Sequence, residues 1–135
     1  MIVISKRTML YSFLILILAI LVYLFMFYIS VIDTKDVTLE GYVFDENTKK
    51  PIENVLVVIN NDRYEDDKGN NNFDEYLGHD KITLYTDKNG YYNTVIEKSA
   101  FVWIDFEKEG YNKHNEKGSY SSKKMNYKIY LKSNN

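Results

Sequence analysis

A run of 25 uncharged residues, from Thr8 to Ile32, constrains this 135-residue chain more than any other feature. At about 1.5 Å per residue, a helix of this length reaches roughly 37 Å, which exceeds the hydrocarbon core of a bilayer, about 30 Å thick. The run contains no Pro or Gly, and it lacks the polar stripe that a surface helix of a soluble fold would carry. We therefore expect one transmembrane α-helix here.

The flanks of the run argue against two other interpretations. A cleaved signal peptide has an apolar stretch of about 7–15 residues followed by small residues. Here Ala19, the only alanine of the run, lies in its middle, and the run ends with bulky residues such as Tyr28 and Ile29. A lipid-attached form would need a cysteine, and the sequence has none. We interpret residues 8–32 as an uncleaved signal anchor.

The charges on either side of the run predict its orientation. Lys6 and Arg7 precede the run, whereas Asp33, Lys35 and Asp36 follow it. Because positively charged flanks stay in the cytoplasm, residues 1–7 are expected to form a cytoplasmic tail. Residues 33–36 would then be a short tether and residues 37–132 an extracytoplasmic domain. The predicted location is a bacterial inner or plasma membrane, with the chain crossing it once.

The composition of the exported part narrows the classes of partner. After the anchor, 15 basic residues face 19 acidic ones, a formal net charge of −4. A nucleic-acid-binding domain would present a basic surface, so we expect no nucleic-acid partner. About 100 residues suit a single domain. Without cysteine, its core must form by burial alone.

The hydrophobic pattern after the anchor predicts strands and no helix of useful length. Apolar and polar residues alternate, or apolar residues run together, over short segments separated by polar turns, and residues 87–90 read as a hairpin turn. We predict an all-β fold, a six- to seven-stranded antiparallel or mixed β-sandwich preceded by one transmembrane helix. The predicted strands are Val37–Phe44, Val55–Ile59, Ile82–Tyr85, Tyr91–Ile96, Phe101–Phe106 and Met125–Leu131.

Four segments, in order, carry a resemblance to a known family. They are GYVFD at 41–45, KPIENV at 50–55, TDKNGYY at 86–92 and EGY at 109–111. Together they resemble the carboxypeptidase regulatory-like domain over about residues 37–131. The resemblance implies a transthyretin-like (prealbumin-like) sandwich, similar to starch-binding-like folds, that has no catalytic centre of its own.

An acidic stretch departs from the pattern of that family. Residues 60–80 carry seven acidic and two basic side chains, and in the family the preceding strand passes quickly to the hairpin. We interpret the stretch as an insertion, solvated and partly disordered, whose replacement by a short linker would leave the fold intact.

A second interpretation of the insertion is a calcium site. Oxygen ligands surround a glycine at position 69, as a hard cation requires, although Lys68 stands where the strict EF-hand pattern needs a ligand. The calcium candidates are Asp66, Asp67, Asn70, Asn72 and Asp74.

Catalysis has little support in the sequence. The two histidines, His79 and His114, lie in polar segments, and a nucleophilic cysteine is lacking. Catalytic sites are built by convergence of several groups, which these residues do not indicate. We predict no catalytic residues, no cofactor and no enzymatic activity.

Two aromatic residues are the candidate ligand-binding side chains. Phe101 and Trp103 alternate with Val102 and Ile104, so they fall on the opposite face of a strand. On a solvent-facing sheet they could stack on sugar rings, whereas in a covered sheet they would be core.

The predicted function is a non-catalytic binding or structural module, anchored to the membrane through residues 8–32. Its partner would be an envelope protein or a glycan that the sequence does not identify. The alternative is a carbohydrate-binding accessory module that uses exposed aromatic residues. Clustered exposed aromatics would favour a sugar ligand, whereas a bare sheet edge would favour β-augmentation by a partner protein.

Overall fold

The computed structural model describes residues 5–134 as two units, one ending at Ile32 and the other beginning at Asp33. The first unit contains helix α1, Lys6–Ser30, whose side chains are all exposed. Ser5 caps it, because its side-chain oxygen accepts a hydrogen bond from the Thr8 backbone N–H at 3.2 Å. By length and composition α1 fits a membrane anchor or a signal sequence. The helix begins and ends two residues before the bounds of the predicted membrane span, 8–32, and the span itself stays a prediction.

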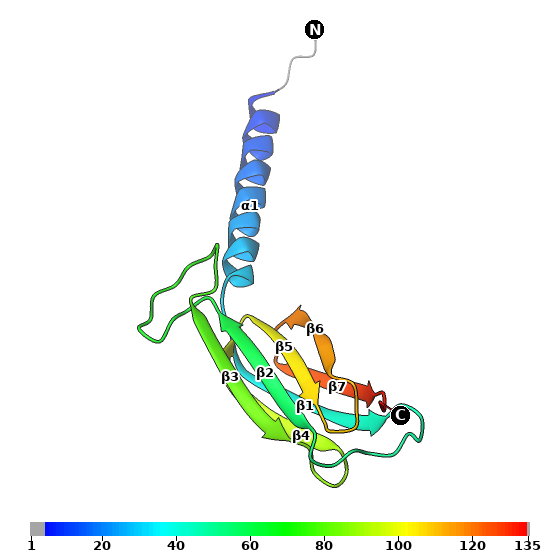
Figure 1. Cartoon of the computed structure of the whole chain (residues 1–135). Helices are drawn as coiled ribbons and strands as arrows, with labels where there is room; N and C mark the ends of the chain where they lie inside the picture. The colour runs from blue at the N-terminus through cyan, green and yellow to red at the C-terminus, as the bar shows by residue number, and fades with distance from the viewer. Residues whose placement is uncertain (1–4, 135) are drawn as a thin grey trace. The chain divides into compact units, whose positions relative to one another are not determined.

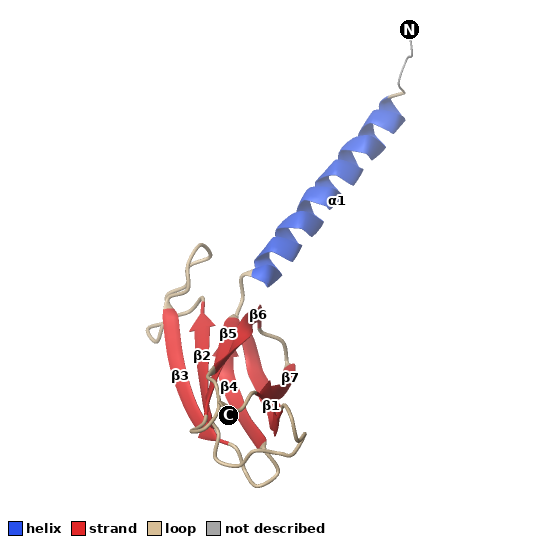
Figure 2. Cartoon of the chain, turned by 45° about the vertical axis from the view of Figure 1, so that its right-hand side comes forward, coloured by secondary structure: helices blue, strands red, loops and turns tan. Residues whose placement is uncertain are grey.

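The second unit is a sandwich of two sheets, drawn in Figure 1 and, by secondary structure, in Figure 2. One sheet has the order β4-β1-β7 and the other the order β3-β2-β5-β6. β1 pairs antiparallel with β4 and parallel with β7, so the first sheet is mixed. The predicted all-β sandwich is confirmed. Its strands are β1 (Thr34–Asp45), β2 (Leu56–Arg63), β3 (Gly78–Tyr85), β4 (Tyr91–Ser99), β5 (Phe101–Glu107), β6 (His114–Tyr120) and β7 (Lys124–Leu131).

The core lies between the sheets and follows the alternation of the sequence. Along β5, the residues that face inward are fully buried and those between them are partly exposed, as predicted. β7 alternates in the same way. Each inward side chain loses apolar surface to water, which stabilises the fold by about 25 cal/mol per Å² without a disulfide. The fully buried apolar residues are Val37, Leu39, Val43, Val55, Val57, Ile59, Val102, Ile104, Phe106 and Leu131.

The segments that carried the family resemblance form the expected local structures. The Asp87 carboxylate accepts hydrogen bonds from the backbone N–H groups of Asn89 and Tyr91 at 2.8 and 2.9 Å. Gly90 has φ of +70°, the left-handed conformation that this turn needs. Gly41 permits a close approach, because a Cβ there would lie 2.6 Å from the Tyr92 hydroxyl. The turn at 87–90 therefore forms as predicted, but the predicted hairpin is wrong. β3 pairs with β2 and β4 pairs with β1, so this turn connects the two sheets.

Two strands, β1 and β6, correct the prediction. β1 begins at Thr34, which pairs with Ser99, so most of the predicted tether belongs to the sheet. β6 was not located from the sequence, because an edge strand of composition HNEKGSY has no apolar alternation. It forms through backbone pairing with β5.

The acidic insertion is shorter than predicted. β2 continues through residues 60–63 and β3 begins at Gly78, so the connecting loop covers residues 64–77. Asn61 is buried, and its amide donates to the Lys98 carbonyl at 2.9 Å and to Asp80 at 3.1 Å. Polar residues can occupy the interior when such partners satisfy them. The interpretation of residues 60–80 as a solvated insertion is therefore wrong at both ends.

Candidate functional site

The predicted ligand-binding residues belong to a larger aromatic group on the outer face of the β3-β2-β5-β6 sheet. The centroid of the Phe101 ring lies 6.4 Å from that of Trp103, 5.5 Å from that of Tyr120 and 6.3 Å from that of Tyr76. Tyr76 in turn lies 5.1 Å from Tyr64. We call these five residues the entry cluster. Tyr120 is 74% exposed, and the other four are partly exposed.

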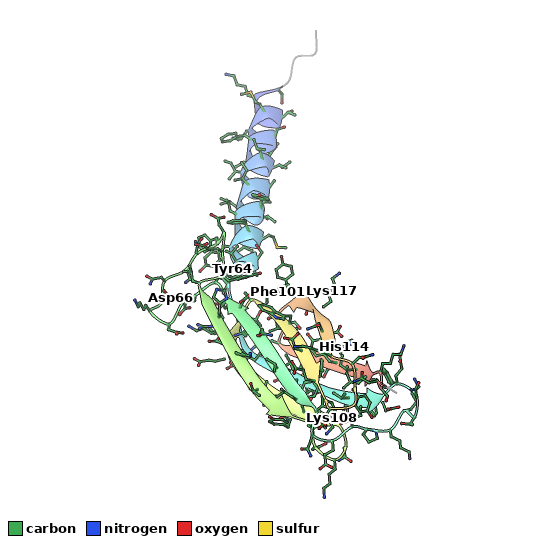
Figure 3. All side chains as sticks on the ribbon, viewed as in Figure 1. Tyr64, Asp66, Phe101, Lys108, His114 and Lys117 are labelled. Atoms are coloured by element: carbon green, nitrogen blue, oxygen red, sulfur yellow. The ribbon has the colours of Figure 1, made fainter. Side chains whose placement is uncertain are left out.

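The entry cluster lies at the end of the sandwich where the chain enters it. Asp33 begins this unit, and its carboxylate accepts a hydrogen bond from the Tyr64 backbone N–H at 2.8 Å. Thr34 donates its hydroxyl to the carbonyl of Ser121, the neighbour of Tyr120, at 3.2 Å. Figure 3 shows Tyr64 and Phe101 at this end of the sandwich and Lys108 at the opposite end.

A glycine makes room for the central ring of the cluster. A Cβ at Gly118 of β6 would overlap the ring of Phe101, so the ring packs directly over the bare backbone. On the other side, burial raises the pKa of Tyr76 to about 12, with a further contribution from Tyr64. The rings of the entry cluster therefore pack against one another and over the backbone of β6. Tyr120 is the most exposed of the five side chains.

Each histidine pairs with one carboxylate. The Nδ1 atom of His79 lies 2.6 Å from the Asp62 carboxylate, and the Nε2 atom of His114 lies 3.0 Å from that of Glu116. Asp80, the sequence neighbour of His79, points instead towards Arg63. Within residues 5–134, no third side chain hydrogen-bonds to either pair, and the absence of catalytic residues stays a prediction.

The calcium candidates are engaged in the turns of their own loop. Asp66 accepts hydrogen bonds from the side chain and backbone of Asn70 and from the Lys68 backbone N–H, and these bonds hold the pKa of Asp66 below its usual value. Asn72 accepts from the Asp74 backbone N–H. Within residues 5–134, three or more His, Cys, Asp or Glu side chains do not gather as a metal site would need. Calcium binding stays a prediction.

A buried guanidinium ties this loop to the sandwich. The Nε and Nη2 atoms of Arg63 lie 2.8 Å from Asp80 and Asp67 respectively, and Nη1 donates to the Glu65 carbonyl at 3.0 Å. The hydrogen bonds to Asp80, and then those to Asp67, raise the pKa of Arg63 above its ordinary value. A third ion pair joins Lys98 and Glu65 at 2.6 Å. These charges line an open hollow of about 430 Å³, where they are already paired with one another.

A second aromatic group, which the sequence did not reveal, lies on the outer face of the β4-β1-β7 sheet. Tyr91, Tyr42, Phe44 and Tyr130 form a chain of rings with successive centroid distances of 5.0, 6.2 and 5.7 Å. We call them the sheet row. They meet because Tyr42 is in register with Tyr91, and Phe44 with Tyr130. The row is near the last residues of β1, so it lies towards the end opposite the entry cluster.

The sheet row combines ring faces with polar and charged groups. The Lys49 ammonium lies 4.7 Å from the centroid of Tyr130, and that of Lys128 lies 5.4 Å from the centroid of Phe44. The Tyr91 hydroxyl donates to Glu40 at 2.9 Å. Tyr42 is 45% exposed. Aromatic faces beside hydrogen-bonding groups can stack on a sugar ring or pack against a peptide.

Comparisons with known proteins show likeness of fold only. No protein-family profile matches the sequence, and no curated protein matches it. Among solved structures, catechol 1,2-dioxygenase from an Acinetobacter species is 12% identical with a TM-score of 0.54, over 73% of this chain and 53% of that one. A 3-chlorocatechol 1,2-dioxygenase from Rhodococcus opacus is 16% identical with a TM-score of 0.52, over 75% and 61%.

A pilus 2b backbone protein from group B streptococcus is 14% identical with a TM-score of 0.49, over 73% of this chain and 41% of that one. The chain thus spans about two fifths to three fifths of the length of the three proteins. At such identities the two dioxygenases establish a β-sandwich and say nothing of its chemistry. The narrower resemblance to the carboxypeptidase regulatory-like domain is not confirmed.

Proposed function

We propose that this protein is a single-pass membrane protein whose exported β-sandwich is a non-catalytic binding module of the cell envelope. The observation that carries the binding role is the sheet row, four adjoining aromatic side chains on an outer sheet face. The anchored location is supported by α1, which begins with Lys6 and Arg7 and is apolar on all sides after them. The carboxypeptidase regulatory-like motifs agree with a module that lacks its own catalytic centre.

Topology is tested with a reporter fused after Asn135. A reporter that works only outside the cytoplasm should be active, because the positively charged flank holds the N-terminal end of α1 inside. Activity of a cytoplasm-only reporter in the same position would contradict the proposal. The same fusion with Lys6 and Arg7 both changed to Glu is the matched control, and its orientation should become mixed.

Binding is tested with a photo-crosslinking residue in place of Tyr42 in the living cell. The matched control places the same residue at Tyr85, which is also exposed, at 63%, but lies on the other sheet. A binding face should give a specific adduct at position 42 that position 85 does not give. Equal labelling at both positions would contradict a role for the sheet row.

The second candidate function is carbohydrate binding, favoured by the aromatic rings and flanking polar groups of the sheet row. Soluble starch and chitin oligosaccharides are suitable probes, in affinity electrophoresis of the detergent-solubilised chain. Retardation that Tyr42→Ala abolishes and Tyr85→Ala preserves would support this function. Retardation lost equally in both variants, or absent from the native chain with both probes, would argue against it.

A further inference from the structure

We propose that the entry cluster rests on the headgroup layer of the membrane that α1 crosses, an inference that depends on the anchoring proposed above. The proposal assigns the aromatic residues at this end to lipid and leaves those of the sheet row free for a partner. It follows from chain length, from the chemistry of the exposed side chains and from the pairing of nearby charges.

The chain between the apolar run and the sandwich is short. Ile32 is the last residue of the apolar run, and Thr34 is the first residue of β1. Two residues extend at most about 7 Å, since one extended residue spans no more than about 3.6 Å. The headgroup layer adds about 5–7 Å to each side of the hydrocarbon core. With the apolar run spanning the hydrocarbon core, covalent geometry therefore places Thr34 within or just above that layer.

Thr34 is in turn joined to the entry cluster by short hydrogen-bonded steps. Its hydroxyl reaches the carbonyl of Ser121, which follows Tyr120, and the neighbouring Asp33 binds the backbone of Tyr64. The residues that flank Thr34 in the sandwich thus include the most exposed tyrosine of the domain. A position near the membrane for Thr34 implies one for Tyr120 as well.

The side chains of the cluster suit that position. Tyr and Trp are enriched at membrane–water interfaces, because an apolar ring can enter the acyl boundary while a polar group remains hydrated. Tyr120 presents such a ring, and Phe73, in the loop that joins Tyr64 to Tyr76, is 53% exposed. Transfer of this partly apolar surface from water into the interface would lower its free energy.

Ion pairs neutralise part of the acidic charge of the loop, because Glu65 pairs with Lys98 and Asp67 with Arg63. Asp66, Asp74 and Glu75 keep the loop negative, which disfavours anionic lipid but not an uncharged lipid surface. Lys117, in the same strand as Tyr120, is exposed and can reach lipid phosphate. Since the contact relies chiefly on aromatic rings, it should form on uncharged phosphatidylcholine and should not require anionic lipid.

The single tryptophan of the sequence, Trp103, allows a direct test in the full chain. The chain is reconstituted in phosphatidylcholine vesicles whose acyl chains are unbrominated, brominated near the headgroup, or brominated near the chain end. Two further variants move the reporter, W103F/Y120W to the outermost position of the cluster and W103F/Y85W to the opposite end of the same sheet. Circular dichroism checks that each variant is folded.

Headgroup-proximal bromine should quench native Trp103 measurably and the Y120W reporter most strongly, and chain-end bromine should quench both less. The Y85W reporter should be unaffected by either lipid. Equal emission of the Y120W reporter in all three vesicles would overturn the proposal. So would a response of that reporter to soluble starch in place of lipid bromine, which would assign the cluster to a saccharide.

Flotation of the vesicles separates this inference from the function on which it rests. If the chain floats with the vesicles after alkaline washing but its reporters are not quenched, anchoring holds and the lipid contact is rejected. If the chain does not float, anchoring itself fails. Each result therefore assigns the failure to one of the two proposals.

Discussion

The entry cluster and the sheet row are both aromatic, yet the backbone builds them differently. The rings of the entry cluster come from two strands and from the loop at 64–77, and Phe101 packs over Gly118. The rings of the sheet row stand on three neighbouring strands in register, and they contact one another and lysine ammonium groups. Cross-strand pairs of this kind contribute little to stability each. A change in the entry cluster should disturb the fold, whereas a change in the sheet row should disturb binding.

The largest test of this contrast removes one side of the entry cluster. Replacing residues 61–79 with a short Gly-Ser linker should abolish the cooperative thermal melt, because it deletes the buried end of β2 together with Tyr64 and Tyr76. This result would reverse the expectation from sequence that the stretch is dispensable. Circular dichroism of the detergent-solubilised chain provides the measurement.

A smaller replacement is the control. Replacing only Lys68 and Gly69, the tip of the turn closed by Asp66 and Asn70, with Ser-Gly should cost little, since both residues are exposed and Asp67, the partner of Arg63, stays in place. If both variants melt like the native chain, the buried extension of β2 is wrong.

The next test compares a buried cation with an exposed one. Arg63→Ala should destabilise the domain by about 3 kcal/mol, the low end for breaking a buried ion pair, because Asp67 and Asp80 can regain some hydration. Lys49→Ala, which removes the ammonium over Tyr130, should cost about 0.5–1 kcal/mol. Urea unfolding measures both. Equal losses would remove the distinction between the two regions.

A third test concerns the ring that Gly118 accommodates. Gly118→Ala should cost about 1–2 kcal/mol, because the new methyl group overlaps Phe101 and forces its ring aside. The emission of Trp103, which adjoins that ring, should shift at the same time. Ser122→Ala, in an exposed turn, is the control and should change neither quantity. An unshifted spectrum in Gly118→Ala would mean that Phe101 does not lie over the glycine.

The sequence predicted most of the fold, because its strands follow local rules. Alternation along residues 101–106 and 125–131, and the Asp87–Gly90 turn, can be recognised without knowing any neighbour. The buried end of β2 could not be recognised, because Asn61 and Arg63 are polar and their partners, Lys98 and Asp80, are remote in sequence. Buried polar residues are stabilised by partners that are distant in sequence, so no local periodicity reveals them.

For the two aromatic groups, too, the sequence predicts the local part of the arrangement and not the part that depends on strand pairing. The faces of Phe101 and Trp103 followed from period-two alternation, and the alternation of Tyr42 and Phe44 on one face of β1 was equally visible. What could not be seen is that Tyr91 and Tyr130 stand beside them, since this requires the register of β1 against both neighbours. Strand register, more than residue type, therefore decides where aromatic surfaces form in this domain.

The smallest effect on stability is expected in the sheet row itself. Tyr42→Ala should lower the free energy of unfolding by about 0.5–1 kcal/mol. The Tyr42 ring is 45% exposed, and its removal deletes ring contacts with Phe44 and Tyr91. The same variant should nevertheless lose the envelope adduct or the saccharide retardation, since the outermost ring faces of the row are removed. Tyr92→Ala, next along β4 but buried against Phe106, is the contrasting variant and should cost several kcal/mol. A Tyr42→Ala chain as unstable as Tyr92→Ala would show that the row is part of the fold, and the binding role would then lose its main support.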